Sequence, residues 1–268
     1  MAEPLSLPLL LSLFALIGAC LGSFANMLIH RLPQEEEIVR TPSHCPKCNA
    51  RLRLPQLIPI FSYLWQRGKC HACRAQISPR YFWVEFICAS LFALVGAMHG
   101  VTFLSAIICL VVLCLIILTA IDLEHMIIPD EIQIALCVLG LLYVWANGKS
   151  WVTAAELAGL GFALGLFLRW LMFVWKKREG LGWGDVKFLV VAGLYLDWPL
   201  LAPFYFFAGV FGLCTAGLAN RTEEGHFAFG PALALALLLC VLFPVFIVKE
   251  FQQIIDFIVE FSVVTINK

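Results

Sequence analysis

Long apolar segments recur along the whole chain and limit what it can fold into. A helix needs about 20 mainly apolar residues to cross the ~30 Å hydrocarbon core of a bilayer. Hydropathy predicts such segments near residues 5–29, 81–99, 101–121, 130–147, 152–175, 185–198, 200–219 and 227–248. At 62% hydrophobic residues, the 268-residue chain also has more apolar surface than a water-soluble core can hide. We therefore expect an all-α polytopic membrane protein with about eight transmembrane helices.

The predicted segments divide the chain into four parts. Residues 1–29 form the first transmembrane helix, which we expect to be retained, because Glu3 stands where a cleavable signal peptide carries Lys or Arg. Residues 30–80 are a polar insertion between helices 1 and 2. Residues 81–248 hold the other seven helices. In residues 249–268 polar side chains recur every fourth position, which predicts an amphipathic helix on the outer surface.

The basic residues are concentrated in one segment, and this predicts the orientation of the chain. The net charge is zero, with 18 basic and 18 acidic residues, so it indicates no acidic partner, and we expect no nucleic-acid partner. Residues 30–80 hold nine of the 18 basic residues, and the positive-inside rule places such a segment in the cytoplasm. Residues 176–178, Lys-Lys-Arg, then fall on the same side, and the amino terminus faces outward.

Two aspartates fall at the cytoplasmic ends of predicted helices. Asp122 ends the third apolar segment and Asp185 begins the sixth, and an ionisable residue at membrane depth indicates a function. One interpretation is helix capping, which suits Asp185 at a positive helix start better than Asp122 at a negative helix end. A second is a proton or cation relay in a transporter. A third is an acid/base pair that shares one proton and hydrolyses peptides without a metal.

Three glycines precede the second aspartate. Gly180, Gly182 and Gly184 leave room for an extended substrate and permit unusual backbone angles. The segment 185–198 that follows has 14 residues, which is roughly 21 Å of helix and short of a full crossing. Such a short helix would let water reach the aspartate, as hydrolysis requires. The alternative is a longer helix that begins nearer Leu181.

Four cysteines of the polar insertion have the spacing of a metal site. Cys45 and Cys48 form one C-x-x-C pair, Cys70 and Cys73 form another, and 21 residues separate the two pairs. Such paired knuckles predict tetrahedral zinc, and a reducing cytosol disfavours the alternative of disulfides. Four thiolates leave no position open for water, so we expect the zinc to be structural and to fold a zinc-ribbon-like insertion.

Several motifs of the chain, taken in order, resemble those of the prepilin peptidases, a family of GxGD aspartyl membrane proteases. "GLGWGDVKF" is similar to the G-x-G-D motif of the family, and "TAIDLEHMIIPDE" is similar to its first aspartate motif. "GACLGSFANMLIHRLP", "SPRYFWVEF" and "FAFGPALALA" are similar to its first helix, the start of its second helix and its last shared span. Together these motifs run from about residue 18 to residue 236.

The resemblance implies an intramembrane aspartyl endopeptidase of the bacterial inner membrane. Such an enzyme removes the basic leader of type IV prepilins or pseudopilins at the cytoplasmic face, in type IV pilus or type II secretion systems. It then methylates the new amino terminus with S-adenosylmethionine. Asp122 and Asp185 match the two catalytic aspartates, within the seven-helix bundle, and the acidic run 35–37 is a candidate partner for the basic leader. The positions expected to support the site are Gly182, Gly184, Asp130 and Lys187.

The site of methyl transfer has a weaker signal in the sequence. No glycine-rich loop followed by a carboxylate indicates a Rossmann-type cofactor domain. Glu85 opens the second helix at the cytoplasmic edge, where its carboxylate could pair with a cationic amine or sulfonium. The alternative is a structural pairing of Glu85 with Arg80 or with a neighbouring helix. Two other classes of protein also stay open: a proton-coupled transporter that uses the two aspartates, and a noncatalytic factor that binds pilin precursors.

Small residues predict close packing of the first helix. Gly18, Gly22, Ser23 and Ala25 would let a neighbouring helix approach, and Asn26 could hydrogen-bond across that contact.

Overall fold

The chain folds into two compact units that are both built from helices. The structure, a computed structural model, describes residues 6–38, 42–176, 181–218 and 228–266. The first unit comprises Met1–Leu139 and the second comprises Gly140–Lys268. The described residues contain no β-strand and only two isolated β-bridges, both in the polar insertion. The prediction of an all-α fold is confirmed.

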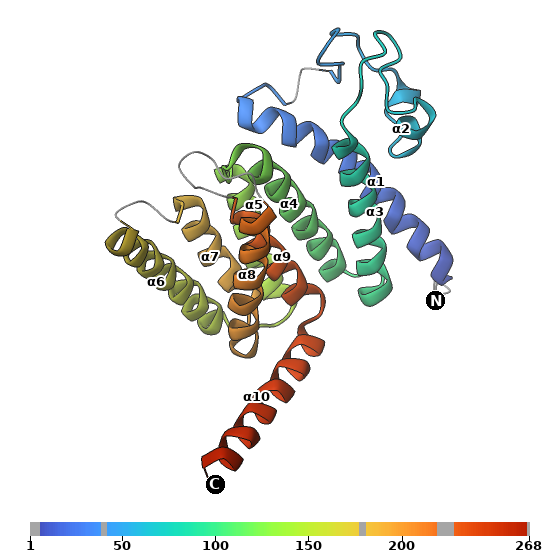
Figure 1. Cartoon of the computed structure of the whole chain (residues 1–268). Helices are drawn as coiled ribbons and strands as arrows, with labels where there is room; N and C mark the ends of the chain where they lie inside the picture. Colours follow the sequence, from blue (N-terminus) through green and yellow to red (C-terminus); the bar gives the residue numbers. More distant parts are fainter. Residues whose placement is uncertain (1–5, 39–41, 177–180, 219–227, 267–268) are drawn as a thin grey trace. The chain divides into compact units, whose positions relative to one another are not determined.

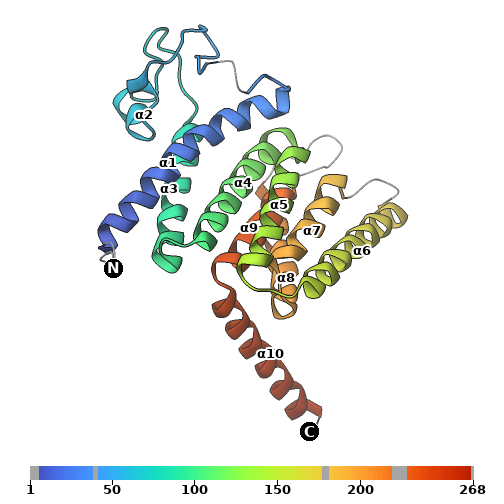
Figure 2. The ribbon, with the colours of Figure 1, turned by 180° about the vertical axis from the view of Figure 1, so that it is seen from behind.

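Long helices and a cysteine-rich loop make up the first unit (Figure 1). Its elements are α1 (Leu7–Arg31), η1 (Leu32–Gln34), η2 (Leu54–Gln56), α2 (Phe61–Trp65), α3 (Pro79–His99), α4 (Phe103–His125) and the start of α5 (Asp130–Ala146). α1 and α3 lie side by side in both views, and α4 packs against both of them (Figures 1 and 2). The loop leaves the end of α1 and returns at the start of α3, so the predicted insertion stands between two helices that pack on each other.

The second unit contains the end of α5 and the helices that follow it (Figure 2). These are α6 (Trp151–Lys176), α7 (Trp183–Tyr195), α8 (Trp198–Leu218), α9 (Gly230–Leu242) and α10 (Pro244–Ile266). α6 packs along α7, and α8 packs along α9. α7 also contacts α9, so it lies between two neighbours and its inner side is buried.

Five helices in the described residues, α1, α3, α4, α6 and α8, are long and apolar enough to cross a membrane, or six spans if the bent pair α9 and α10 counts as one. α5 has 17 residues and α7 has 13. At 1.5 Å per residue these helices are roughly 26 and 20 Å long, which is short of a ~30 Å hydrocarbon core. The chain is a multi-pass membrane protein, and among its described residues fewer helices than the eight predicted are long enough to cross the core completely. The predicted shortness of the helix that holds Asp185 is confirmed.

The last predicted span, residues 227–248, is broken in the structure. α9 ends at Leu242, and α10 begins at Pro244 with a bend of 101° between the two helices. Proline has no N–H to donate and disfavours helical backbone in the residue before it, which here is Phe243, with φ −125° and ψ 46°. The amphipathic tail predicted after residue 248 is therefore the continuation of a helix that starts four residues earlier.

The contact between α1 and α3 depends on glycine. A Cβ atom on Gly18 would lie 2.6 Å from the carbonyl oxygen of Cys88, and one on Gly22 would lie 2.8 Å from the Cα of Glu85. Asn26 Nδ2 donates to the carbonyl oxygen of Tyr81 at 2.9 Å across the same contact. The predicted close packing of the first helix and its hydrogen bond to a neighbour are both confirmed.

A second glycine contact joins α6 to α7. A Cβ atom on Gly161 of α6 would lie 2.4 Å from the carbonyl oxygen of Leu189, and one on Gly193 of α7 would lie 2.4 Å from the amide nitrogen of Ala158. Backbone meets backbone at both positions, so the spacing of these two helices is fixed by the absence of side chains. Gly159, on α6, has open space around it instead.

Candidate functional site

The four cysteines of the insertion come together in two turns of the same design. In the first turn the N–H of Cys45 donates to the carbonyl oxygen of Ala50 at 3.0 Å, and in the second the N–H of Cys70 donates to that of Ala75 at 2.8 Å. All eleven cysteines of the chain lie in described residues and are free thiols. The structure therefore favours a metal site over disulfides, as the sequence predicts.

The geometry of the four sulfurs fits a tetrahedral metal ion. The sulfur atoms of Cys45, Cys48, Cys70 and Cys73 lie within 4.8 Å of one another, and Cys45 Sγ is 4.0 Å from Cys73 Sγ. A tetrahedron with Zn–S bonds of 2.3 Å has sulfur atoms about 3.8 Å apart. The spacing of the four sulfurs is thus close to that of a tetrahedral zinc site.

The backbone and the neighbouring thiols shift the pKa values of two of these cysteines in opposite directions. The backbone N–H groups of Cys73 and Ala72 lower the pKa of the Cys70 thiol to about 7. At Cys48 the N–H of Ala50 also lowers the pKa, but desolvation and the three neighbouring thiols outweigh it and raise the pKa to about 11. A cation bound among the sulfurs would favour the thiolate form, as it does in a Cys₄ zinc site.

Asp122 lies in the last turn of α4. Its side chain is buried, with 4% of the residue exposed, and its backbone carbonyl accepts a hydrogen bond from the N–H of Met126 at 2.9 Å. Met126 has a left-handed backbone, φ 56°, which ends the helix directly after this turn. Helix termination thus leaves a buried carboxylate at the negative end of an apolar helix, where its charge needs compensation.

Asp185 lies in the first turn of α7, in the second unit. Its Oδ2 accepts a hydrogen bond from the N–H of Gly182 at 3.2 Å, so the helix-capping interpretation is correct for one of its oxygens. Gly182 has φ −67°, which any residue adopts, so the expected unusual backbone is absent there. A Cβ atom at Gly182 would lie 3.3 Å from Asp185 Oδ2, so a side chain there would press on this carboxylate. Gly180 lies outside the described residues.

The other predicted supporting residues flank these two aspartates in sequence. Asp130 is the first residue of α5, eight positions after Asp122, and its side chain is exposed. Lys187 is exposed on α7, one residue beyond the buried Val186, and Gly184 is part of the first turn of the same helix. Asp122 and Asp130 belong to the first unit, and Asp185 and Lys187 belong to the second.

Glu85 connects α3 to the cysteine-rich loop. The residue is 7% exposed, and its Oε2 accepts a hydrogen bond from the N–H of Ile60 at 2.7 Å. The expected alternative partner, Arg80, forms an ion pair with Glu124 instead. Ile60 has φ 63° and ψ −57°, and the N–H of Phe61 donates to the carbonyl oxygen of Pro59 across it, which is a strained γ-turn. The buried carboxylate thus holds a strained turn of the loop against α3.

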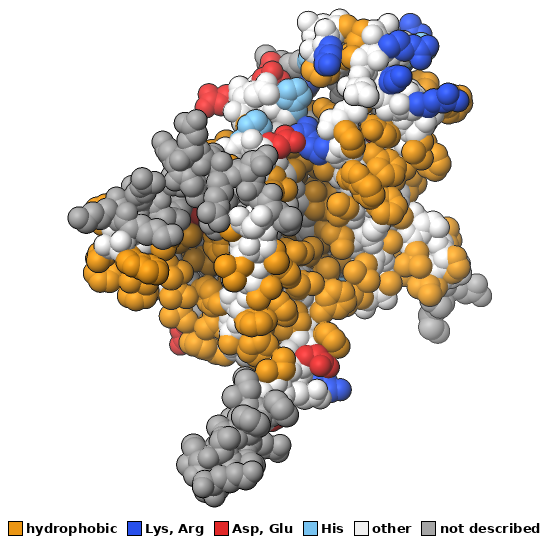
Figure 3. Space-filling model, viewed as in Figure 1, with side chains coloured by type: hydrophobic (Ala, Val, Ile, Leu, Met, Phe, Trp, Pro, Cys, Tyr) orange, Lys and Arg blue, Asp and Glu red, His pale blue; other side chains and the backbone are white. Residues whose placement is uncertain are grey.

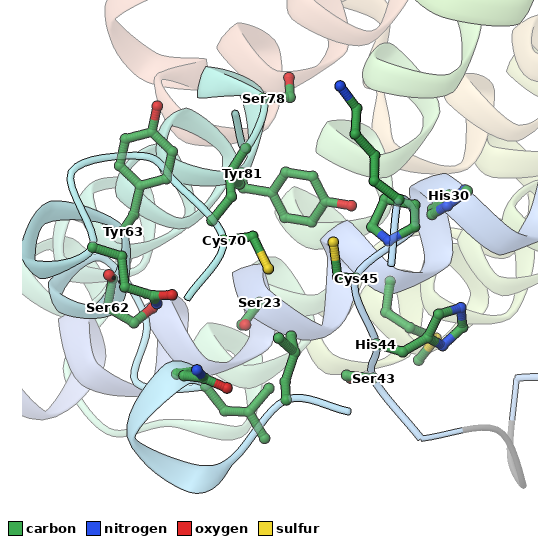
Figure 4. A pocket seen from close by; sticks show the side chains of 18 of the residues that line it. Ser23, His30, Ser43, His44, Cys45, Ser62, Tyr63, Cys70, Ser78 and Tyr81 are labelled. Carbon is green, nitrogen blue, oxygen red and sulfur yellow. Dashed lines mark hydrogen bonds between the residues drawn. The ribbon is translucent and has the colours of Figure 1, made fainter. Parts of the chain in front are cut away.

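A cavity of about 340 Å³ lies between α1, the loop and the start of α3, within the first unit (Figure 4). Ser23 of α1, Cys45 and Cys70 of the loop, and Tyr81 of α3 surround the middle of this space. Glu85 also lines it. Sequence analysis predicted Glu85 but missed the cavity, because its walls come from three segments that only the fold brings together.

One further residue that sequence analysis missed stabilises the far end of α7. Lys149 Nζ donates to the carbonyl oxygens of Tyr195 and Leu196 at 2.9 and 2.8 Å and pairs with Asp197 at 3.2 Å. A cation is favourable at the negative end of a helix. Burial lowers the pKa of the Lys149 ammonium, although Asp197 opposes that effect. The signal was its position, since Lys149 is the only charged residue between the predicted apolar segments 130–147 and 152–175.

Comparison with known proteins gives matches in both units. The model of the bacterial peptidase A24 N-terminal domain matches residues 16–99, and the model of the type IV leader peptidase family matches residues 109–217. No solved structure matches the chain significantly.

Curated relatives match over most of the chain. A prepilin leader peptidase/N-methyltransferase of Neisseria gonorrhoeae is 31% identical over 85% of this chain and 89% of its own length. Proteins of the same name from Aeromonas salmonicida and Pseudomonas aeruginosa are 33% and 29% identical, over 84% and 90% of this chain and 88% and 93% of their own lengths. The chain therefore belongs to the family of the prepilin leader peptidase/N-methyltransferases.

Proposed function

We propose that the protein cleaves the leader peptide from type IV prepilins or pseudopilins and then methylates the new amino terminus. Family membership over most of the chain carries this proposal. The active site is the pair Asp122 and Asp185, which match the aspartate motifs of the family. It lies at the cytoplasmic face of the bacterial inner membrane, because the basic insertion 30–80 faces the cytoplasm.

The chemistry needs one protonated and one ionised carboxyl group. The ionised aspartate removes a proton from water, the water oxygen attacks the carbonyl carbon of the scissile peptide, and the other carboxyl protonates the leaving amide nitrogen. The buried Asp122 and the half-buried Asp185 are the two carboxyl groups proposed to share this proton. Asp185, partly exposed at the start of the short α7, is the group that meets water.

Supporting residues hold this pair and its substrate. Asp130 and Lys187 place further charges near the two aspartates in sequence, and the glycines Gly182 and Gly184 precede Asp185 without side chains of their own. The acidic run 35–37 is exposed at the end of α1, where it can attract the basic leader from the cytoplasm. The apolar part of the precursor stays in lipid while the leader is cleaved.

We assign the binding of S-adenosylmethionine to the cavity between α1, the loop and α3. The cofactor supplies a methyl group on a sulfonium cation, and the Glu85 carboxylate offers the opposite charge in the wall of the cavity. Aromatic and polar walls, such as Tyr81 and Ser23, suit an adenosine group. Its volume of about 340 Å³ falls within the range of small-molecule sites.

The zinc ion is structural in this proposal. Cys45, Cys48, Cys70 and Cys73 would hold it and fold the loop that forms one wall of the cavity. Removal of zinc should therefore impair methyl transfer more than cleavage.

Mass spectrometry of a prepilin incubated with the detergent-purified protein tests both reactions. We expect loss of the leader with the unaltered protein and none with Asp122→Asn or Asp185→Asn, and a methyl-sized mass increase only when S-adenosylmethionine is present. Cleavage that persists in both variants would rule out the aspartate pair. Ion-driven uptake into vesicles without cleavage would favour a transporter, and precursor capture without product would favour a binding factor.

Calorimetric titration tests the cofactor site independently of activity. S-Adenosylmethionine is cationic, whereas S-adenosylhomocysteine lacks the charged sulfonium. If Glu85 faces the sulfonium, Glu85→Gln should weaken the cationic ligand by about tenfold and leave the neutral one nearly unchanged. Equal weakening of both ligands would indicate a structural role for Glu85 only.

A further inference from the structure

One segment of the cysteine-rich loop has its apolar side turned outward. Leu54, Ile58 and Phe61 follow one another at spacings of four and three residues, and Leu64 and Trp65 come three and four residues after Phe61. All five are exposed, with Leu54 at 83%, Phe61 at 70% and Trp65 at 89%. We name these five residues the apolar face. A loop in water would bury such a face.

The opposite side of the same segment is more polar and faces inward. Gln56, Ser62 and Gln66 line the cavity together with Leu57 and Tyr63, and Gln66 also donates to the carbonyl oxygen of Ser62 at 3.1 Å. The segment is amphipathic with its polar side on the protein and its apolar side on the surroundings. This arrangement is the reverse of a soluble loop and requires an apolar partner.

The segment that carries the apolar face contacts the start of α3 through aromatic rings. The ring of Tyr63 lies 5.7 Å from that of Phe82, and Phe82 stacks on Phe86 at 6.0 Å. Phe86 and Trp83 are exposed on α3, one of the helices able to cross the membrane. Figure 3 shows this apolar surface running from the loop onto the upper part of α3, with Lys and Arg side chains gathered beyond it.

Charge at the ends of the segment identifies the partner. Arg53 precedes the apolar face directly and Arg67 follows it, and both side chains are exposed. Aromatic residues between two arginines are typical of segments that lie in a membrane interface, where the rings enter the acyl boundary and the cations meet anionic headgroups. A basic leader peptide would be repelled by the same arginines.

We infer that the apolar face inserts into the inner leaflet of the membrane beside α3, with Arg53 and Arg67 bound to anionic lipid headgroups. The cysteine-rich loop then lies on the bilayer as a monotopic element. This inference needs neither cleavage nor methyl transfer, and it stands if the proposed function fails.

Photo-crosslinking in the full-length protein tests this insertion. A benzophenone amino acid replaces Trp65 in one variant and Gln66, on the inward side of the same turn, in the matched control. Both proteins are placed in nanodiscs containing phosphatidylglycerol, with and without a prepilin, and the adducts are identified by mass spectrometry. We expect lipid adducts at position 65 in both conditions and few at position 66.

Three results would overturn the inference. Adducts to prepilin without lipid would make the apolar face a substrate-docking surface, adducts to a second copy would make it a dimer contact, and the absence of adducts would leave it in water. A second measurement isolates the arginines. In phosphatidylglycerol discs, Arg53→Gln and Arg67→Gln should each lower the ratio of membrane-inserted to free loop by about fivefold, measured as the yield of lipid adducts at position 65. An equal yield in neutral phosphatidylcholine discs would overturn their role.

Discussion

Glu85 in the first unit and Asp185 in the second each accept a hydrogen bond from a backbone N–H, but over very different lengths of chain. The partner of Glu85 is Ile60, 25 residues away in the cysteine-rich loop. The partner of Asp185 is Gly182, three residues away at the start of the same helix. One carboxylate holds a distant loop in place, whereas the other only completes the helix that carries it.

The difference teaches how a substitution at each position should be interpreted. Loss of the Asp185 carboxylate removes one local cap, so its effects on activity report chemistry. Loss of the Glu85 carboxylate frees a strained turn and one wall of the cavity, so its effects mix chemistry with structure. An amide isostere separates the two at both sites, because its oxygen still accepts the hydrogen bond while the charge is gone.

The largest effect is expected at Asp185. Asp185→Asn should lower kcat/KM for leader cleavage by roughly 10²–10⁴-fold, the range for loss of a general acid or base. Its thermal unfolding should stay close to that of the unaltered protein, because the amide oxygen can still accept the Gly182 N–H. Asp256→Asn, which changes an exposed carboxylate that accepts from Gln252, is the control. A large fall in melting temperature with Asp185→Asn would mean that the charged carboxylate contributes to the stability of the fold as well as to the reaction.

If the hydrogen bond to Gly182 contributes little, the packing of α6 on α7 should be what positions Asp185. Two glycine substitutions on α6 test this. Gly161→Ala should lower the free energy of unfolding by about 1–3 kcal/mol and reduce cleavage, because its Cβ would meet the Leu189 carbonyl. Gly159→Ala, on the same helix in open space, should be neutral or stabilising by up to about 1 kcal/mol. Denaturant unfolding in mild detergent measures both. Equal effects of the two changes would show that helix spacing is unimportant.

Glu85 provides the matching test in the first unit. Glu85→Ala should destabilise the loop by about 1–3 kcal/mol, because the N–H of Ile60 loses its acceptor. Glu85→Gln should keep the loop and impair methyl transfer alone. Hydrogen exchange over residues 44–76, measured beside both reactions, distinguishes these results. If Glu85→Gln loosens the loop as much as Glu85→Ala does, charge rather than the hydrogen bond holds it.

The smallest effect is a pH dependence at the far end of α7. The pKa of Lys149 is lowered in the folded protein, so above this pKa and up to about 10.4 the unfolded chain binds more protons than the folded chain. Stability should therefore rise with pH through this window relative to Lys149→Met, which cannot titrate. Melting temperatures of the two proteins at several alkaline pH values measure it. A parallel pH profile would mean that Lys149 has an ordinary pKa.

Local patterns predicted much of this structure. The two C-x-x-C pairs predicted the cysteine cluster because each pair is a self-contained turn, and Gly18, Gly22 and Asn26 predicted a helix contact that exists. Pro244 carried a visible signal for the break after α9, but the apolar run on both sides of it concealed that signal.

Partners that are distant in sequence were not predictable. Arg80 is nearer to Glu85 in sequence than Ile60 is, yet the loop brings the Ile60 N–H to the carboxylate and leaves Arg80 for Glu124. The walls of the cavity come from three separate segments, and Lys149 contacts backbone carbonyl oxygens of a distant helix end. Neither arrangement can be predicted from the types of the residues involved. The pairing of Asp122 with Asp185 rests on the family motifs and awaits the cleavage experiments.

The glycine contacts between α6 and α7, at Gly161 and Gly193, have a consequence for inherited variation and for protein engineering. Gly161 and Gly193 have no side chains, yet they set how closely α7 packs on α6. The position of Asp185, at the start of α7, therefore depends on two residues that take no part in the reaction. A saturation library scored for leader cleavage should find any added side chain at these sites damaging, although less so than changes at the aspartates. No substitution at Asp122 or Asp185 would compensate for a side chain added at either glycine.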